Sequence, residues 1–330
     1  MSENVTPQHG GRVRAAAHEY RIAARNWLDV STGINPHGWP VPPVPADVWQ
    51  RLPEEDDGLY MATTACFGST LVLPVAGTQA AIQVLPRLRP SCRVGVLFPT
   101  YFEHINAWRI AGHTVRGVSS DEIEHVLDDL DVLVVVNPNN PTGTLIDPAQ
   151  LSIWSARLAA RGGWLIVDEA FIDATPLSSI AGAVPSPGLI VLRSLGKFWG
   201  LAGVRAGFVL SERQILTKLA AASGPWHISH PARWIAQRAL MDLDWCEQMR
   251  ARLPADSERL AGVLASHGLQ SPSGCALFRW VPTERAAALH DALARQAVLV
   301  RRFEEGLRFG LPGEEAAWQK LDAALREVMR

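Results

Sequence analysis

Short apolar segments recur through the middle of the chain and alternate with stretches of helical periodicity. Runs rich in Val, Leu and Ile fall at 71–76, 94–98, 132–136, 164–167, 189–192 and 206–210. Runs that are apolar on both faces are typical of buried parallel strands joined by helical crossovers. The pattern therefore predicts an α/β domain in which helices cover both faces of a mostly parallel sheet.

The pattern changes after about residue 225. A long helix is expected over 234–249, and further strands are expected at 276–281, 298–301 and 307–311. We interpret this part as a smaller α+β domain. Two domains also suit a chain of 330 residues, because single cores stop growing near roughly 250–300 residues.

The clearest break in composition is the Pro-rich stretch 36–45. We interpret it as a connector between an N-terminal arm and the main domain. The expected division is an arm that forms part of the small domain (1–44), a large cofactor-binding domain (45–225) and a C-terminal small domain with its linking helix (226–330).

Charge and cysteine content narrow the function classes. With 33 acidic and 31 basic residues, the chain lacks the basic excess that binds nucleic acid or anionic membranes. The four cysteines form no C-x-x-C pair, so neither a metal site nor a disulfide framework is expected. The N-terminus lacks the features of a secretory signal, and no apolar run is long enough to span a bilayer. We expect a cytoplasmic protein without nucleic-acid or membrane partners.

Unusual loops follow the predicted strands. They contain Gly77-Thr78-Gln79, Pro99-Thr100-Tyr101, the stretch 137–143, the stretch 168–171 and the stretch 194–197. In open α/β sheets, ligands bind outside the carboxyl ends of the strands. We therefore expect the five loops to form a single pocket.

Lys197 is the first candidate for covalent chemistry. Only three of the 31 basic residues are lysines, and the other two, Lys218 and Lys320, fit solvated helix positions. Arginine is a fixed cation, whereas lysine can lose its proton and become a nucleophile. Lys197 lies in a Gly-rich turn after a predicted strand, with Ser194 three residues before it and Arg205 eight residues after it.

A lysine near a carboxylate at a strand end meets the needs of pyridoxal phosphate. This cofactor is tethered to a lysine and is kept protonated on its ring nitrogen, so that it acts as an electron sink. Asp168 is the natural partner for the pyridinium, because a charge-assisted hydrogen bond holds the proton on the ring. Taken alone, Asp168 also fits the role of a helix cap.

The cofactor phosphate needs hydrogen-bond donors. The Gly77-Thr78-Gln79 turn begins a predicted helix and offers backbone N–H groups, and Ser194 and Arg205 would complete the site. Taken alone, this turn is better explained by an ordinary helix cap. Tyr101 is a candidate for stacking on the pyridine ring, and Asn140 for donating to its O3′ atom; a lone tyrosine is also common in a core or on a surface.

Three ordered motifs resemble the fold-type I pyridoxal-phosphate enzymes of the aminotransferase class I/II group. They are the stretch 137–143, the stretch 167–171, and Ser194-Leu-Gly-Lys197 with Arg205 beyond it. Within this group the chain is most similar to L-threonine-O-3-phosphate decarboxylases of cobalamin synthesis, with histidinol-phosphate aminotransferases as the near alternative. The segments that carry this likeness are 9–11, 28–38, 168–173, 192–198, 298–301 and 307–310.

The resemblance implies a role for each candidate residue. Lys197 would hold the cofactor covalently, Asp168 would pair with the pyridinium, Asn140 would bind O3′ and Tyr101 would stack on the ring. The implied ligands of the cofactor phosphate are Thr78, Ser194 and Arg205, with Gly77 and Gln79 beside them.

The resemblance also implies a set of substrate ligands. Arg308 would bind the substrate carboxylate, which suits the fork of a guanidinium. His9 and Arg301 would bind a substrate phosphate, although Arg302 competes with Arg301 for this role. Gly33 and Asn35 would shape a loop beside the substrate. Without the resemblance, His9 fits a solvated terminal residue and Arg308 fits a surface strand residue.

The chain departs from the group's pattern at three positions near the cofactor. Gly196 stands just before the lysine, where the group often has serine. Phe171 stands where the group often has tyrosine, and Leu52 stands where aminotransferases commonly offer a tyrosine from the neighbouring subunit. Each change removes a hydroxyl group. Tyr60 is a nearby candidate to replace the tyrosine missing at Leu52.

The implied reaction is decarboxylation of a phosphorylated amino acid by a homodimer. Decarboxylation and transamination differ in which bond of the substrate Cα lies perpendicular to the cofactor ring, and no single residue reports that orientation. A third interpretation, a cofactor-binding module without turnover, is hard to reconcile with the presence of both Lys197 and Arg308.

Overall fold

The computed structural model describes residues 9–330, and these form two compact units. The larger unit contains 38–140 and 144–250; the smaller contains the chain up to His37, Pro141–Gly143 and Ala251–Arg330. Residues 38–44 and 226–250, which we expected in the small domain, thus lie in the larger unit. The reason is local packing: Trp39 N donates to Trp199 O, the indole of Trp199 donates to Ala239 O, and Arg233 forms an ion pair with Asp57.

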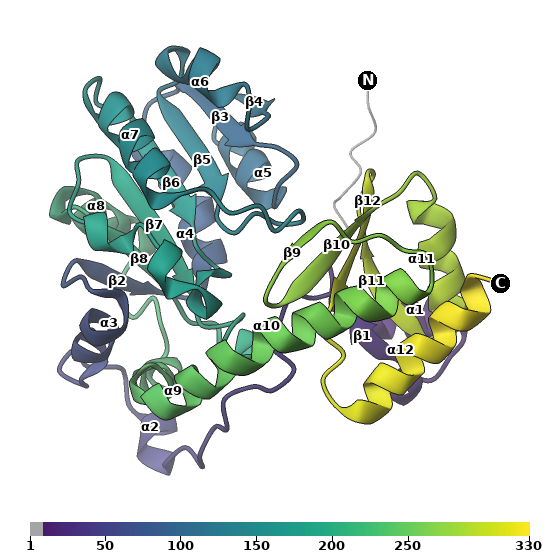
Figure 1. The fold of residues 1–330 in the computed structure, drawn as a ribbon. Coiled ribbons are helices and arrows are strands. Elements are labelled where there is room, and N and C mark those ends of the chain that lie inside the picture. Colours follow the sequence, from purple (N-terminus) through teal and green to yellow (C-terminus); the bar gives the residue numbers. More distant parts are fainter. Residues whose placement is uncertain (1–8) are drawn as a thin grey trace. The chain divides into compact units, whose positions relative to one another are not determined.

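A seven-stranded sheet forms the centre of the larger unit (Figure 1). The strand order is β2-β8-β7-β6-β5-β3-β4. The strands are β2 (Val72–Val75), β3 (Arg93–Leu97), β4 (Thr114–Val118), β5 (Val132–Val136), β6 (Trp164–Asp168), β7 (Leu189–Ser194) and β8 (Gly207–Ser211). The α/β class is confirmed and the sheet is mostly parallel, but β8 runs antiparallel to both β2 and β7. The expectation that the run 206–210 is a parallel strand was wrong: residues 195–206, which join β7 to β8, contain only a short 3-10 helix (Ala202–Val204) and no crossover α-helix.

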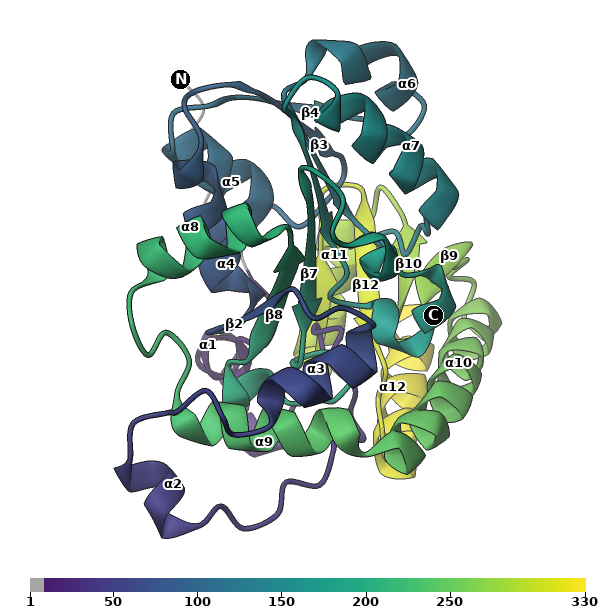
Figure 2. The same ribbon diagram turned by 90° about the vertical axis from the view of Figure 1, so that its left-hand side faces the viewer.

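Helices cover both faces of this sheet, as Figure 2 shows. On one face lie α4 (Thr78–Val84), α5 (Glu103–Ile110) and α8 (Arg213–Ser223), whose apolar side chains share a core with alternate residues of the strands. On the other face lie α6 (Ile123–Val126) and α7 (Pro148–Ala159). Helix α7 begins where Asp147 Oδ1 accepts a hydrogen bond from Ala149 N and Pro148 occupies the first turn, a common helix start.

Strand β4 was not foreseen from the sequence. It pairs in parallel with β3 at one edge of the sheet, and three of its five residues are exposed. An exposed edge strand needs no continuous apolar run, so its sequence gives a weak signal.

The helix expected over 234–249 is two helices. Helix α9 (His230–Met241) ends before Asp242, and α10 (Leu243–Ser266) begins after it. Asp242 leaves the helical backbone at φ −83° and ψ 78°. Its Oδ1 accepts a hydrogen bond from Trp245 N and its Oδ2 accepts one from Trp39 Nε1. Asp242 therefore starts the second helix, as a cap does.

Two other helices of the larger unit are α2 (Ala46–Gln50) and α3 (Leu59–Phe67).

The smaller unit is built on a five-stranded sheet of order β1-β11-β12-β10-β9. Its strands are β1 (Leu28–Val30), β9 (Ser273–Cys275), β10 (Phe278–Pro282), β11 (Val298–Arg302) and β12 (Gly306–Gly310). Its helices include α1 (Val13–Tyr20), α11 (Ala286–Arg295) and α12 (Glu315–Val328). Strand β1 pairs in parallel with β11, which joins the N-terminal arm to the C-terminal part of the chain. Among the described residues, no helix has the length and apolar character needed to cross a membrane.

Candidate active site

The loops after the parallel strands of the larger unit meet at one edge of its sheet. Asn137 N donates to Asp168 O at 2.8 Å, and Glu169 N donates to Leu192 O at 2.9 Å. The side chain of Asn139 donates to Pro99 O at 2.9 Å, which joins the loops after β5 and β3. These contacts bring together the segments that carry the predicted cofactor ligands.

Asp168 is the last residue of β6 and is held from two sides. Its Oδ2 lies 2.9 Å from Nε2 of His104 in α5, and its Oδ1 accepts a hydrogen bond from Ala170 N. Both Asp168 and His104 are almost fully buried. Sequence reasoning missed His104; the signal that could have found it is its position three residues after Tyr101, in the first turn of the next helix.

Lys197 lies in the turn after β7, and its amine contacts the loop that follows Asp168. Its Nζ atom is 5.3 Å from the centroid of the Phe171 ring. Gly200 N donates to Lys197 O, which closes the turn. Phe171 is thus a direct neighbour of the amine.

Tyr101 is oriented by a short chain of hydrogen bonds. Its hydroxyl group donates to Gln79 Oε1 at 3.1 Å, and Gln79 Nε2 donates to Glu103 Oε2 at 3.2 Å. The Tyr101 ring meets the His104 ring edge-on, with 6.2 Å between centroids. The side chain of Gln79 therefore holds Tyr101 in place. The backbone N–H of Gln79 is the group of this residue that could donate a hydrogen bond to a phosphate.

A compact cradle forms where β2 ends and β8 begins. Gly77 has φ +75°, and a Cβ atom at this position would lie 2.8 Å from Nη2 of Arg205. A Cβ atom on Gly207 would lie 2.6 Å from Thr78 N. Ser194 pairs with Gly207 across β7 and β8, so its hydroxyl group belongs to the same cradle. The predicted phosphate ligands thus lie around Gly77 and Gly207, two positions where a side chain would collide with its neighbours.

Asn140 lies at the end of the loop that follows β5. The loop is closed by Asn137, whose Oδ1 accepts a hydrogen bond from Ile146 N at 2.8 Å, and by a bond from Asn139 N to Thr144 O. Asn140 is half-buried. It is the last residue of the larger unit before Pro141–Gly143, which belong to the smaller unit.

The predicted substrate ligands lie in the smaller unit. Arg301 and Arg308 are directly paired across the antiparallel strands β11 and β12, so both side chains leave the same face of the sheet. Arg308 is buried, its Nη2 donates to Ser31 O at 2.8 Å, and its guanidinium lies over the Phe278 ring. Burial, followed by the charge of Arg301, lowers the pKa of Arg308 to about 10. This face of the sheet therefore concentrates positive charge.

Ser31 also brings the N-terminal arm to this face. Its Oγ accepts a hydrogen bond from Gly11 N at 2.8 Å, and a Cβ atom on Gly10 would lie 2.5 Å from Ser31 O. His9, the first described residue, precedes this contact and is exposed. The carbonyl oxygen of Ser31 thus accepts a hydrogen bond from Arg308 and also lies close to the backbone of Gly10.

The other predicted positions have simpler surroundings. Asn35 is buried and accepts a hydrogen bond from His37 N on its Oδ1, which shapes the loop that also contains the buried Gly33. Leu52 is exposed. Tyr60 lies beneath the guanidinium of Arg233, with 5.7 Å between Cζ and the ring centroid. No group of His, Cys, Asp and Glu side chains in residues 9–330 is arranged to hold a metal ion.

The chain matches the family model for aminotransferase class I and II over residues 62–318. It is 55% identical to the threonine-phosphate decarboxylase of Pseudomonas aeruginosa over 96% of this chain and 97% of that protein. The chain belongs to the aminotransferase class I and II family. A threonine-phosphate decarboxylase from a Sinorhizobium species is 41% identical over 97% of this chain and 98% of that protein.

The family assignment agrees with the fold. The histidinol-phosphate aminotransferase of Sinorhizobium meliloti, solved in complex with pyridoxal-5'-phosphate, superposes with a TM-score of 0.83 at 19% identity, covering 100% of this chain and 98% of that one. The resemblance inferred from the motifs around Asp168 and Lys197 is therefore confirmed for family and fold. Membership of this aminotransferase family limits the reaction class but leaves the substrate to be argued from the site.

Proposed function

We propose that the chain decarboxylates L-threonine O-3-phosphate to (R)-1-amino-2-propanol O-2-phosphate and carbon dioxide, with pyridoxal phosphate as its cofactor. The observation that carries this proposal is the cross-strand pair of Arg301 and Arg308. Like charges directly opposite each other cost stability, and a substrate with both a phosphate and a carboxylate offsets that cost. The identity to two threonine-phosphate decarboxylases supports the same substrate.

The residues at the edge of the larger sheet fit pyridoxal phosphate. The Gly77 and Gly207 positions let backbone N–H groups and the Arg205 guanidinium converge, which suits a phosphate. Thr100 Oγ1, in the loop before Tyr101, is buried and has no hydrogen-bond partner among the described residues. Asp168 and Lys197 supply the carboxylate and the amine that a pyridinium aldehyde requires.

When bound, pyridoxal phosphate supplies an electron sink for the pair left on the substrate Cα as carbon dioxide departs. Asp168, whose carboxylate is held by His104, would keep the ring nitrogen of the cofactor protonated. Lys197 would hold the cofactor through its amine, and the same amine would move a proton to the substrate Cα. Tyr101, oriented by Gln79, would contact the ring.

The smaller unit supplies the substrate ligands in this proposal. Arg308 binds the carboxylate, and Arg301 with His9 binds the phosphate. Strand geometry favours Arg301 over Arg302, because adjacent residues of a strand leave opposite faces. The charge of Arg302 acts on His290 of α11 more strongly than that of Arg301 does: burial, followed by Arg302, lowers the pKa of that imidazole.

Histidinol-phosphate transamination is the alternative, because the same fold carries it in the Sinorhizobium meliloti protein. The deciding experiment incubates the holoenzyme with L-threonine O-3-phosphate while carbon dioxide and the phosphorylated amino alcohol are quantified. A parallel reaction contains histidinol phosphate and 2-oxoglutarate and is assayed for glutamate. We expect carbon dioxide in the first and no glutamate in the second. Glutamate alone would assign the chain to transamination, and bound cofactor without either product would identify a non-catalytic module.

A second copy of the chain is the partner that we propose, acting in the cytoplasm. Large apolar side chains are exposed on and beside helices α2, α3 and α9, which pack together: Trp49, Leu52, Met61 and Met241. Such side chains commonly mark an interface. Light scattering on a sizing column should give twice the single-chain mass of 36.0 kDa. Replacing Trp49 and Met61 with polar residues should weaken the dimer and shift the measured mass towards that of a single chain.

A further inference from the structure

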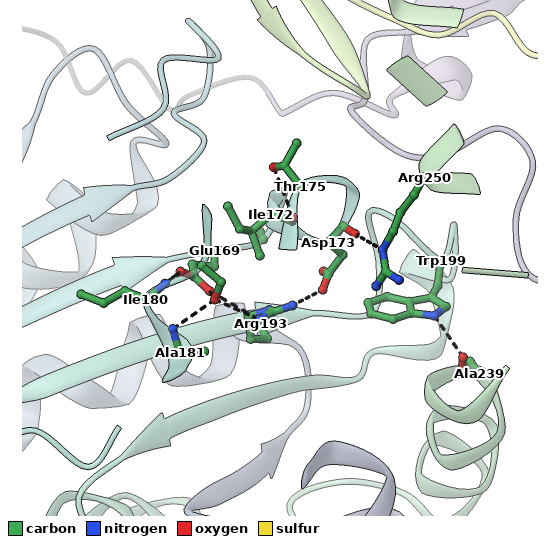
Figure 3. A network of polar contacts seen from close by, with 12 residues as sticks. Glu169, Ile172, Asp173, Thr175, Ile180, Ala181, Arg193, Trp199, Ala239 and Arg250 are labelled. Atoms are coloured by element: carbon green, nitrogen blue, oxygen red, sulfur yellow. Dashed lines mark hydrogen bonds and ion pairs between the residues drawn. The ribbon is translucent and has the colours of Figure 1, made fainter. Parts of the chain in front are cut away.

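A second group of charged side chains, separate from the predicted cofactor and substrate ligands, joins β7 to the segment that follows β6 (Figure 3). Glu169, Asp173 and Arg193 are each at most 3% exposed. Glu169 directly follows Asp168, and Arg193 directly precedes Ser194. On β7, successive residues point to opposite faces, so the Arg193 side chain leaves the face opposite to that of Ser194. Glu169 directly follows β6, and Asp173 lies in the short 3-10 helix beyond it (Ile172–Ala174).

Arg193 joins the two ends of the segment that follows β6. Its Nη1 lies 3.4 Å from Glu169 Oε2 and 3.4 Å from Ser179 Oγ, and its Nη2 forms an ion pair with Asp173. Glu169 in turn accepts hydrogen bonds from Ser179 Oγ at 2.5 Å and from Ile180 N at 2.7 Å. One guanidinium on β7 therefore fixes the start, middle and end of this segment.

The same group reaches the turn that contains Lys197. Arg250 of α10 donates to Asp173 O at 3.1 Å, and its guanidinium lies 5.8 Å from the centroid of the Phe198 ring. Phe198 directly follows Lys197. Glu169 N also donates to Leu192 O, so the backbone joins β6 to β7 at this level. Movement of Arg193 or Asp173 would therefore displace the backbone beside both Asp168 and Lys197.

Stability alone is a weak reason for this arrangement. Burying ions costs several kcal/mol per charge, about as much as the pairing returns, and neutral residues of similar volume often replace such groups without loss. Burial raises the pKa of Glu169 and Asp173, while the Arg193 charge opposes that rise. A buried ionic group does restrict the geometry of its neighbours, because few arrangements satisfy all of its hydrogen bonds.

We propose that Arg193, Glu169 and Asp173 are positioning residues that fix the separation between the Asp168 carboxylate and the Lys197 amine. The proposal rests on the cofactor assignment made above. The side chains themselves touch neither the cofactor nor the substrate. They act by holding the ends of β6 and β7, from which the two reacting groups extend, and a displacement of about 1 Å at such a site can cost about 100-fold in rate.

The test replaces all three charges at once, by Glu169→Gln, Asp173→Asn and Arg193→Met, so that no unpaired charge stays buried. Three quantities are measured on the protein loaded with pyridoxal phosphate: the pH midpoint of the cofactor's visible absorbance change, the Kd for the cofactor, and kcat. The melting temperature of the cofactor-free protein reports stability. Glu169→Gln alone is a milder variant in case the triple variant fails to fold, and Arg193→Lys restores the charge without the fork.

We expect the triple variant to keep its melting temperature within a few degrees, to shift the absorbance midpoint by about one pH unit, and to lose about 10-fold in cofactor affinity and 10- to 100-fold in kcat. Glu169→Gln should shift the midpoint in the same direction, and Arg193→Lys should lie between the triple variant and the original chain. The matched control removes another ion pair of the larger unit, by Arg157→Met with Glu124→Gln, and should leave the midpoint unchanged.

The outcomes separate this proposal from the one on which it rests. If the original chain gives no absorbance change with pyridoxal phosphate, the cofactor assignment fails. If the original chain binds the cofactor and turns over, but the triple variant and Glu169→Gln keep the same midpoint, affinity and kcat, the positioning role is overturned. A loss of melting temperature with an unchanged midpoint would also overturn it, because the group would then serve stability only.

Discussion

The Nε2 atom of His104 lies 2.9 Å from Oδ2 of Asp168, although 64 positions separate the two residues in the chain. Both side chains are buried, so little water competes for this contact. The imidazole and the backbone N–H of Ala170 fix the two carboxylate oxygens. The carboxylate is therefore held in one orientation before any ligand arrives, which lowers the cost of aligning it.

Replacing His104 with asparagine should weaken cofactor binding and slow turnover. A hydrogen bond to a charged group contributes about 1.5–3 kcal/mol, so a loss of about 10- to 100-fold in kcat/KM is expected. Cofactor affinity by fluorescence titration and steady-state kinetics measure the effect. His125→Asn, at an exposed position on α6, is the control. Equal behaviour of the two variants would contradict the role of His104.

Lys197→Arg should abolish covalent attachment of the cofactor. The guanidinium keeps the positive charge but does not deprotonate near neutral pH, so it cannot act as a nucleophile. Borohydride reduction followed by mass spectrometry should find pyridoxal phosphate on the original chain and on Lys218→Arg, an exposed control in α8. A reduced adduct on the Lys197→Arg protein would refute the assignment.

Gly77→Ala should lower affinity for pyridoxal phosphate more than it lowers stability. The added Cβ atom would lie 2.8 Å from Arg205 Nη2, at a backbone φ of +75°. Gly112→Ala is a matched control, since Gly112 has φ +87° and nothing within 4 Å of the added atom. Both variants carry backbone strain of about 1 kcal/mol, but only Gly77→Ala should raise the Kd for the cofactor, by about 10-fold or more.

Arg301→Gln should raise KM for threonine phosphate by about 10- to 100-fold, because a charge-assisted contact with the phosphate is lost. Arg302→Gln removes the same charge from the other face of β11 and should change KM less than about twofold. Initial rates over a range of substrate concentrations at fixed ionic strength compare the two variants. A larger effect from Arg302→Gln would reverse the assignment.

Two cysteines should react slowly and lower stability at alkaline pH. Burial raises the pKa of Cys66 to about 12 and that of Cys246 to about 11, from an ordinary value of 9.0. Folding thus favours the protonated thiols, so their contribution is complete below about pH 9 and is lost as the pH rises towards 11 and 12. At pH 8, iodoacetamide labelling of both residues, followed by mass spectrometry, should be about 100-fold slower in native than in denatured protein. Equal rates would contradict the burial effect.

The sequence could propose candidate site residues because the motifs that carry them are local. Lys197 and Asp168 each follow an apolar run, and the loops after parallel strands meet at one edge of a sheet. The strands that were missed or misjudged are those with weak or ambiguous patterns: β4 is exposed, β1 has three residues, and β8 has the apolar composition of a parallel strand but runs antiparallel. Strand direction is set by the connection and the pairing, which composition does not report.

The sequence by itself determined the α/β class and the family and proposed Lys197 and Asp168 as cofactor ligands, because hydrophobic periodicity and motif order are properties of neighbouring residues. Only the tertiary structure decided which side chains orient them. His104 reaches Asp168 across 64 positions, Arg193 reaches Asp173 across 20, and Arg308 reaches Ser31 across 277. Such contacts depend on strand register and on which face each residue occupies, and both are fixed when the sheets assemble.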